Sequence, residues 1–266
     1  MPDLRARQLS KRYSGLHVVR NVNLTVRPGE VVGYLGPNGS GKTTTARMLA
    51  GLLDPSNGVV EYDGKDIRSD LLGFRTRLGY IPEEPFLYPF LSGREYLQLV
   101  GRLREIPERL LEEKIDGFLE LFNLSTAADQ SIASYSKGMR QKIVISAALL
   151  HDPAVVIFDE PETGLDVTTT MMLRHLVRTL AGRGKAILYS SHILEVVEKV
   201  CDRILVLHKG DVVADDSIER LRTLLESSTL EGVFAQLVIR DDPEQLARDL
   251  ADLSAMSAPS TALRAR

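Results

Sequence analysis

A glycine-rich segment from Gly36 to Thr43 fits the phosphate-binding pattern G-x-x-x-x-G-K-[ST] at every fixed position. The apolar run 31–35 before it predicts a buried strand, and a helical pattern follows it, which is the context that the motif requires. Glycines let backbone N–H groups converge on phosphate oxygens, and the N-terminus of the following helix adds a favourable dipole. A glycine turn that happens to precede a helix is the alternative, and the Lys-Thr pair makes it the weaker one. The segment therefore predicts a binding site for a nucleoside triphosphate.

Individual residues of this segment have separate predicted roles. Lys42 is expected to reach the β- and γ-phosphates, and the Thr43 hydroxyl is expected to hold Mg²⁺. The predicted nucleotide-binding residues of the segment are Gly36, Pro37, Asn38, Gly39, Ser40, Gly41, Lys42, Thr43 and Thr44.

Two acids, Asp159 and Glu160, come directly after the apolar run 155–158. An acid at the end of such a strand supports Mg²⁺ in enzymes with this loop, a role that suits Asp159. Glu160 is placed to activate the attacking water as general base. The alternative is a buried strand that merely emerges into solvent-facing acids, and the dipeptide alone does not decide between the two. Because sites in open α/β sheets gather at the carboxyl edge of the strands, the pattern favours a hydrolase over a protein that only binds.

Residues 134–141, Ser-Tyr-Ser-Lys-Gly-Met-Arg-Gln, resemble the LSGGQ signature segment of ABC ATPases. They lie between the phosphate loop and the strand-end acids, which is the order found in that family. The resemblance implies that the nucleotide is ATP, and that Ser136 and the backbone at Gly138 contact the γ-phosphate of ATP held by the opposite subunit. Helix N-termini favour anions, in agreement with this role. Ser136 also suits an ordinary helix N-cap, and both roles can hold together.

Further positions resemble the same family over about residues 1–225. Tyr13 is similar to the aromatic residue that stacks on adenine, although a tyrosine that packs within a strand fits the sequence as well. Residues 163–166 resemble the D-loop, so the resemblance places Asp166 near the phosphate loop of the partner subunit. His192 matches the switch histidine that senses the γ-phosphate, and the resemblance implies a catalytic role for it.

The chain departs from the family at the residue after Ile81-Pro82, where Glu83 replaces the usual glutamine. A carboxylate can still meet Mg²⁺ through a water molecule, although its charge would change the metal affinity. Glu83 therefore joins Thr43 and Asp159 as a predicted metal residue, and we expect ATP and Mg²⁺ as the cofactors.

Several weaker likenesses bear on the direction of transport. The signature carries Tyr135, Lys137 and Met139 in place of Leu, Gly and Gln. Variants of this kind, and the run Pro82-Glu83-Glu84 followed by Leu-Ser-Gly-Arg-Glu at 91–95, resemble export-type ABC ATPases. Residues 230–234, Leu-Glu-Gly-Val-Phe, likewise resemble a short C-terminal motif of that group. These likenesses favour an exporter over an importer.

Hydrophobic periodicity predicts the elements that position these residues. Short strands are expected within 4–35, and helical periodicity dominates 84–151, where Ser92 begins a capping box. From Val155 the succession of strand, helix and strand predicts a parallel sheet with helices on its faces. A hairpin over 204–214 is expected to close the sheet.

The predicted fold class is α/β, with a P-loop NTPase core, a mostly parallel sheet, an N-terminal antiparallel β subdomain and an inserted helical subdomain. Residues 1–225 are expected to form the ABC ATPase domain, with the helical subdomain inserted at about 84–151. Residues 226–266 are expected to be a C-terminal helical extension with a disordered tail from Ser254.

Composition limits the function classes. The net charge of -3 and the pI near 6.0 argue against a generally cationic binder of nucleic acid or lipid, so no nucleic-acid partner is expected. No apolar run approaches the roughly 18 residues that cross a bilayer, and residues 1–3 begin no apolar signal segment. The single cysteine, Cys201, excludes an internal disulfide and fits a reducing cytosol. We expect a cytoplasmic protein, peripheral on the inner face of the cell membrane through an integral membrane permease.

The resemblance predicts an ATP-hydrolysing ABC transporter subunit that works as a homodimer, or as a heterodimer with a second ATP-binding subunit. One alternative is a soluble ABC-type ATPase acting on ribosomes or chromosomes. Such proteins carry two ATPase units or a long coiled coil. This chain has one phosphate loop, and the segment between Lys42 and Asp159 is too short to contain a long coiled coil. The other is a regulatory module that binds ATP without hydrolysing it, motivated by Glu83 and the altered signature. A phosphate-release assay separates that module from a motor.

Overall fold

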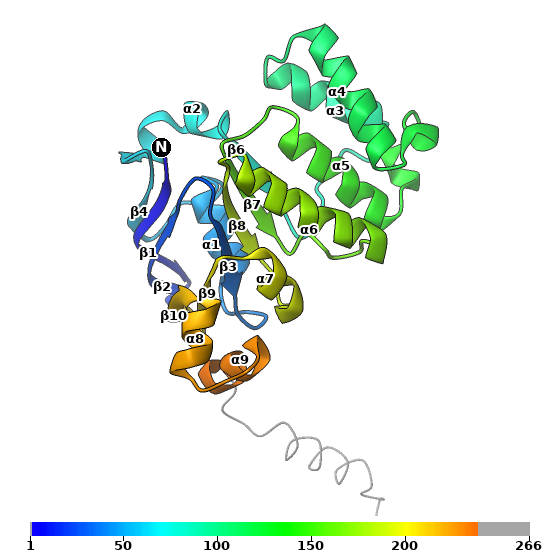
Figure 1. Ribbon diagram of the computed structural model, residues 1–266. Coiled ribbons are helices and arrows are strands. Elements are labelled where there is room, and N and C mark those ends of the chain that lie inside the picture. Colours follow the sequence, from blue (N-terminus) through cyan, green and yellow to red (C-terminus); the bar gives the residue numbers. More distant parts are fainter. Residues whose placement is uncertain (1, 239–266) are drawn as a thin grey trace, which may run out of the picture.

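The computed structural model describes residues 2–238, which form two β-sheets with helices around them (Figure 1). The first sheet is antiparallel, in the order β2-β1-β4-β5. Its strands are β1 (Leu4–Tyr13), β2 (Leu16–Val26), β4 (Asn57–Tyr62) and β5 (Lys65–Asp66). Short strands were predicted here, but β1 and β2 run for 10 and 11 residues. A register shift between Ala6 and Leu9 lets the long pair bend and continue.

The second sheet has six strands in the order β10-β9-β3-β8-β7-β6. They are β3 (Val31–Leu35), β6 (Leu78–Ile81), β7 (Val155–Asp159), β8 (Ala186–Ser190), β9 (Arg203–His208) and β10 (Asp211–Ser217). All neighbours are parallel except β10, which closes the sheet antiparallel to β9. The arrangement confirms the predicted α/β class, its mostly parallel sheet and the closing hairpin. Strand β6 was not predicted.

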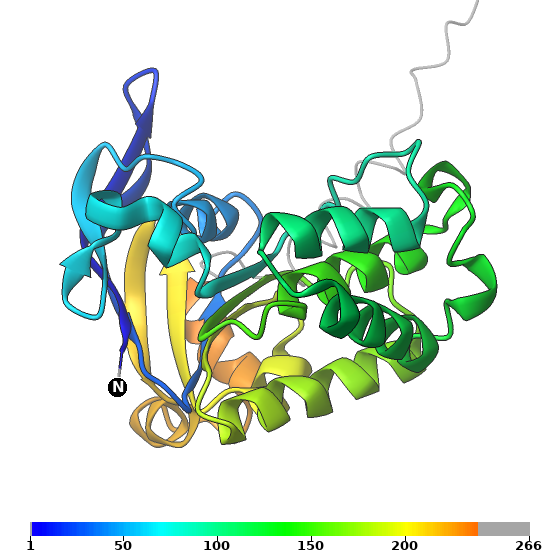
Figure 2. The ribbon, with the colours of Figure 1, turned by 90° about the horizontal axis from the view of Figure 1, so that it is seen from above.

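Helices connect the strands and cover the parallel sheet. They are α1 (Lys42–Leu49), α2 (Leu71–Arg75), α3 (Gly93–Leu103), α4 (Glu108–Leu121), α5 (Lys137–Leu149), α6 (Val167–Gly182), α7 (Leu194–Val200), α8 (Ile218–Leu224) and α9 (Leu230–Val238). Short 3-10 helices span Ile67–Asp70, Ser125–Ala127 and Ile132–Ser134. Helices α3, α4 and α5 lie between β6 and β7 in the chain, and Figures 1 and 2 show α3 and α4 set apart from the sheets.

The predicted capping box at the start of α3 is present. The Ser92 hydroxyl accepts a hydrogen bond from the Glu95 N–H at 3.1 Å, and the Glu95 carboxylate accepts one from the Ser92 N–H at 2.8 Å. Two N–H groups that have no partner within the helix are thereby satisfied, which fixes where α3 begins.

Alternate residues of the parallel strands face two different hydrophobic cores. Val32 and Tyr34 of β3 pack in the core between the two sheets, together with residues of α1. Val31 and Leu35 point to the opposite face and pack in the core that includes residues of α5, α6 and α7. With both faces covered, β3, β7 and β8 are buried at every position and their carboxyl ends meet at one edge.

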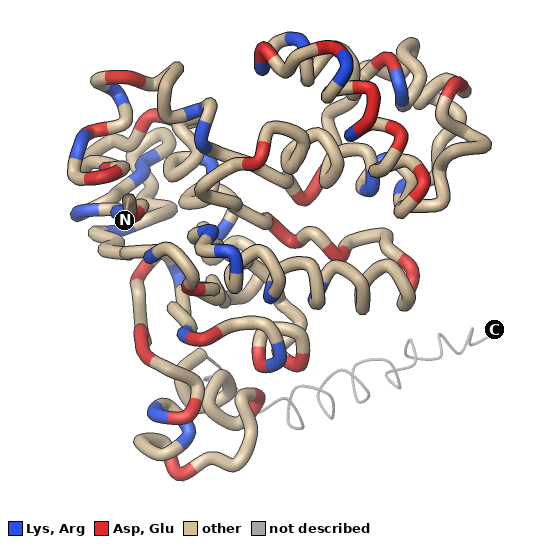
Figure 3. The backbone as a smooth tube through the Cα atoms, turned by 45° about the horizontal axis from the view of Figure 1, so that its top comes forward, with Lys and Arg blue, Asp and Glu red and all other residues tan. Residues whose placement is uncertain are grey.

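Helices α8 and α9 occupy the first part of the stretch predicted to be helical at the C-terminus. The rest of that stretch and the predicted tail from Ser254 lie outside the described residues. Basic and acidic residues are interspersed along the described backbone (Figure 3), in agreement with the small net charge of -3. Among residues 2–238, no helix is both long and apolar enough to cross a bilayer.

Candidate functional site

The phosphate loop leaves the carboxyl end of β3 and ends at the N-terminus of α1, and its glycines are required by close backbone contacts. Gly39 and Gly41 have φ values of 77° and 108°, in the left-handed region that favours glycine. A Cβ atom on Gly36 would lie 2.4 Å from the carbonyl oxygen of Leu207, and one on Gly41 would lie 2.7 Å from that of Val18. The loop is therefore held against β2 and β9 in a conformation that only glycine allows at these positions.

Lys42, the first residue of α1, folds its side chain back over the loop. Its Nζ donates hydrogen bonds to the carbonyl oxygens of Gly36 at 2.8 Å and Pro37 at 3.4 Å. The same ammonium lies 3.3 Å from Oε1 of Glu160, and both side chains are at least nine-tenths buried. A charge buried this deeply is costly unless it is paired, so the ion pair holds the lysine in place across the site.

Asp159 ends β7 and accepts hydrogen bonds from three hydroxyl groups. Ser190 Oγ and Thr43 Oγ1 donate to its Oδ1 at 2.8 and 3.4 Å, and Tyr80 donates to Oδ2 at 3.3 Å. Burial raises the pKa of Asp159, and these three donors partly offset the rise. The structure thus brings together Thr43 and Asp159, the two principal residues predicted to hold Mg²⁺.

Glu160 connects the phosphate loop to the predicted switch histidine. Its Oε2 accepts hydrogen bonds from His192 Nδ1 at 2.6 Å and from the His192 N–H at 3.3 Å, while Oε1 faces Lys42. The backbone of Glu160 has a φ of 50°, which is uncommon for a residue with a side chain and recurs at functional sites. Lys42, Glu160 and His192 come from three separate segments and form one contiguous chain of contacts.

A cavity of about 260 Å³ lies over the phosphate loop. Its lining includes Val18, Asn38, Gly39, Gly41, Lys42, Thr43, Thr44, Glu83 and Glu160. Glu83 therefore lies at the same cavity as Thr43, as its predicted metal role requires, whereas Gly36 and Ser40 are buried residues of the loop that do not line the cavity.

The donor set fits Mg²⁺, because the hydroxyl of Thr43 and the carboxylates of Asp159 and Glu83 are hard oxygen ligands. In the described part of the chain no cluster of three or more acid, histidine or cysteine side chains could hold a metal by itself. Mg²⁺ at nucleotide sites usually takes its remaining ligands from phosphate oxygens and water.

Tyr13 lies at the end of β1 and is 47% exposed, with Lys11 Nζ 5.4 Å from the ring centroid. Its ring is therefore partly open to solvent, and the Lys11 ammonium lies over it. Tyr13 does not line the cavity at the phosphate loop, so its stacking on adenine stays a prediction.

Ser136 caps the N-terminus of α5, where its Oγ accepts a hydrogen bond from the Met139 N–H at 3.2 Å. Gly138 packs against the D-loop segment of the same chain, since a Cβ there would lie 2.8 Å from the carbonyl oxygen of Gly164. Asp166 caps α6 and accepts from the N–H and hydroxyl of Thr169, which lowers the pKa of Asp166. None of Ser136, Gly138 and Asp166 lines the cavity at the chain's own phosphate loop.

Two residues that hold Asp159 were missed by the sequence analysis. Tyr80 lies on β6, a four-residue strand too short to be recognised, and Ser190 ends β8. Both contacts join segments far apart in the chain. The hydroxyl two positions before His192, at the end of a buried strand, was the one local signal available.

Comparison with known proteins gives consistent matches. Residues 19–163 match the family model described as "ABC transporter". The ABC transporter ATP-binding protein NatA of Bacillus subtilis is 37% identical over 236 residues, which is 88% of this chain and 96% of that protein. The Nod factor export ATP-binding protein I of Ralstonia nicotianae is 36% identical over 222 residues, 84% of this chain and 69% of that protein. A solved chain described as "Structure of ATP binding subunit of ABC transporter" superposes with a TM-score of 0.83 at 32% identity, covering 88% of this chain and 98% of that one.

Proposed function

Because this chain belongs to the ABC transporter family and is an ATP-binding, ATP-hydrolysing transporter subunit, we propose that it powers export through a separate membrane permease. The contacts of the buried Glu160 carboxylate with Lys42 and His192 carry the proposal for hydrolysis. The likeness to a Nod factor export protein, together with the exporter-like segments 82–84 and 230–234, supports the outward direction.

In the proposed reaction, the loop N–H groups and Lys42 hold the β- and γ-phosphates of ATP. Glu160 takes a proton from the water that attacks the γ-phosphorus, while the bond from phosphorus to the ADP oxygen breaks. His192, bonded to Glu160 Oε2, keeps the carboxylate turned toward the site. Thr43, Asp159 and, through water, Glu83 would hold Mg²⁺. The bound cation offsets the charge of the phosphates.

We further propose that two such subunits meet head to tail, in a homodimer or a heterodimer. Ser136 is the N-cap of α5, and the first turn of this helix contains no acidic residue. The helix dipole is therefore available to an anion. Ser136 and Gly138 do not line the chain's own cavity, which fits a role toward ATP on a second protomer. Gly138 packs on Gly164, so the signature and D-loop segments would reach the partner together.

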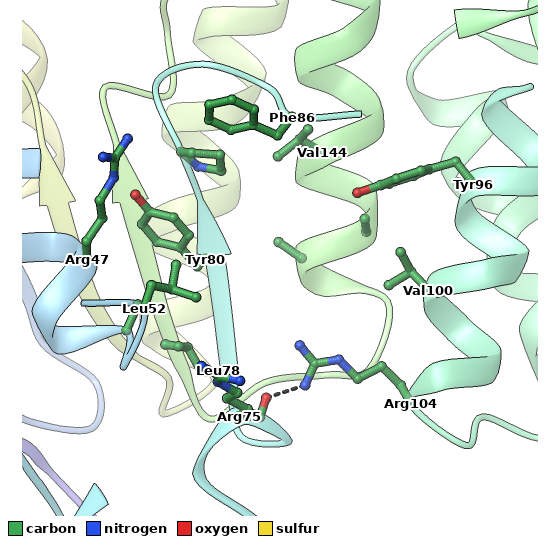
Figure 4. Close-up of a pocket in the computed structure, with 14 residues that line it drawn as sticks. Arg47, Leu52, Arg75, Leu78, Tyr80, Phe86, Tyr96, Val100, Arg104 and Val144 are labelled. Atoms are coloured by element: carbon green, nitrogen blue, oxygen red, sulfur yellow. Dashed lines mark hydrogen bonds between the residues drawn. The ribbon is translucent and has the colours of Figure 1, made fainter. Parts of the chain in front are cut away.

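A groove of about 690 Å³ supports docking of the permease (Figure 4). Its lining includes three arginines, Arg47, Arg75 and Arg104, among apolar and aromatic residues, and no carboxylate. Arg104 donates a hydrogen bond to the carbonyl oxygen of Arg75, and burial together with the Arg75 charge lowers the pKa of Arg104. Within the described residues none of the three arginines pairs with an acid, so a permease segment that carries a carboxylate fits the groove.

Exposed aromatic residues continue this surface from Phe86, which itself lines the groove. Phe86, Tyr88 and Phe90 are between half and three-quarters exposed, and Tyr88 packs near Tyr96 with ring centroids 6.3 Å apart. Exposed apolar groups gathered in this way are typical of a protein interface. We propose that this face holds the chain on the inner side of the membrane.

Purification from detergent-solubilised membranes tests this function. An affinity-tagged chain in saturating Mg-ATP is expected to retain an integral membrane protein, identified by mass spectrometry. A tagged chain that retains ribosomes or chromosomal proteins instead would favour the soluble ABC-type ATPase.

A further inference from the structure

A second buried carboxylate lies two positions after Glu160. Glu162 is 9% exposed, and its Oε2 accepts a hydrogen bond from Ser191 Oγ at 3.4 Å. Its Oε1 lies 3.8 Å from Nε of Arg174 on α6, and neither of these two atoms has a hydrogen-bond partner within the described residues. An acid buried this deeply costs stability unless its contacts serve the fold or the site, and the reaction proposed above leaves Glu162 without a role.

The Ser191 contact leads directly to the switch histidine. While Ser191 Oγ donates to Glu162, it also accepts a hydrogen bond from the Ile193 N–H at 3.1 Å. Ser191 therefore fixes the backbone on both sides of His192, whose N–H and ring nitrogen contact Glu160. The loop 191–193 is held by two carboxylates, with Glu160 on the His192 side and Glu162 on the Ser191 side.

Glu162 also belongs to the turn that begins the D-loop segment. Its carbonyl oxygen accepts a hydrogen bond from the Leu165 N–H at 3.0 Å, which closes the turn leading to Gly164 and Asp166. Glu162 thus contacts the loop 191–193, called the switch loop below, through its side chain, and the D-loop segment through its backbone.

We infer that Glu162 is a positioning residue for hydrolysis, which holds Ser191 so that His192 stays bonded to Glu160. The inference rests on the proposed role of Glu160 as general base. Glu162 does not line the cavity at the phosphate loop and acts through Ser191. It also couples the D-loop segment to the switch loop within one chain, so that contact of the D-loop segment with a partner subunit reaches the general base.

Substitutions at both ends of the Ser191–Glu162 bond test this inference. E162A and S191A in the full chain are each expected to lower kcat for Mg-ATP about tenfold, because the hydrogen bond that orients His192 is lost. The KM for ATP should stay within about twofold, since the phosphate loop is untouched. E162Q keeps an oxygen that can accept the same bond and should retain more activity than E162A. E113A, which removes an exposed acid paired with Arg109 on α4, is the matched control and should keep wild-type kcat.

A double-mutant cycle separates positioning from a general loss of stability. In an H192A background, E162A should lower the remaining kcat by less than about twofold, because its target is already absent. The inference would be overturned by a wild-type kcat in S191A, or by effects of E162A and H192A on kcat that multiply. It would also be overturned if E162A lowered Tm and left kcat unchanged. If E162A does not fold, the kcat values of S191A and E162Q test the inference in its place. Normal hydrolysis by E160Q would contradict the proposed role of Glu160 as general base. An inactive E160Q together with a fully active S191A would contradict only the positioning role of Glu162.

Discussion

Glu160 Oε1 lies 3.3 Å from Lys42 Nζ, and this buried ion pair joins the end of β7 to the phosphate loop. The same carboxylate holds His192 through its other oxygen. Because Lys42 is also the cation expected to bind the triphosphate, nucleotide binding and the release of Glu160 from its partner are physically linked. The proposed general base is therefore paired with the residue that is expected to bind the triphosphate.

Replacing the general base should separate hydrolysis from binding. E160Q is expected to lower kcat by about 10²–10⁴, the usual scale for general-base catalysis, while ATP still binds. Phosphate release measures the first effect, and titration with a fluorescent ATP analogue measures the second. E84Q, which changes an exposed neighbour of Glu83, should match wild type. An E160Q variant that keeps hydrolysis within threefold of wild type contradicts the assignment.

The Mg²⁺ concentration needed for hydrolysis should rise more when a direct ligand of the cation is lost than when a residue that acts through water is changed. Chelation of Mg²⁺ should abolish hydrolysis. T43V should raise the Mg²⁺ concentration for half-maximal activity by about tenfold or more, because a direct oxygen ligand is lost. E83Q should shift it by less than about threefold, because Glu83 is expected to act through water. A larger shift for E83Q than for T43V would reverse the proposed roles.

The arginine groove should decide whether the chain keeps its membrane partner. In R75E/R104E, the acid-bearing permease segment proposed above meets two negative charges in place of two positive ones. We expect at least about tenfold less permease in the affinity purification. R109E, which reverses the charge of one exposed arginine on α4, is the control, and Tm reports whether each variant is folded. Equal recovery of the permease by R75E/R104E and wild type would rule out the groove as the docking site.

Acid should destabilise the fold partly through His151. Its Nε2 lies 3.0 Å from the Leu78 carbonyl oxygen, and burial, followed by the Arg104 charge, lowers its pKa to about 4. The pKa in the unfolded chain is about 6.5, so protons bind the unfolded state better between these two values. The stability that the neutral ring contributes is complete above about pH 6.5 and is lost as the pH falls toward 4. Tm measured from pH 7.5 to 4.5 should fall more for wild type than for H151Q, and parallel curves would contradict the prediction.

The local part of the site could be predicted from the sequence, because the phosphate loop and the Asp159-Glu160 pair are each set by a few consecutive residues. The strand order could not. Strand β8 lies between β3 and β7, and this pairing of distant segments brings Ser190 to Asp159 and His192 to Glu160. The burial of Glu162 could not be predicted from the sequence either, because this residue belongs to no motif and only its surroundings in the fold distinguish it.

Other expectations depended on three-dimensional surroundings as well. The N-cap and the ligand role proposed for Ser136 were both open from sequence, and the fold shows the cap. The three arginines of the groove come from α1, α2 and the end of α3, so no window of sequence reveals them as one cluster. Strand β6, with only four residues, gives too short a pattern for its period to be read.

The most direct test of the account is the mass of E160Q in saturating Mg-ATP, measured by analytical ultracentrifugation. If Ser136 of one subunit caps ATP on the other, E160Q should sediment as a dimer, at twice the 29.5 kDa of one chain, and return to a monomer without nucleotide. E160Q/S136R, folded by Tm and still binding ATP, should stay monomeric. An E160Q chain that is saturated with ATP and remains at 29.5 kDa, or a dimer that the S136R substitution leaves intact, would contradict the proposal.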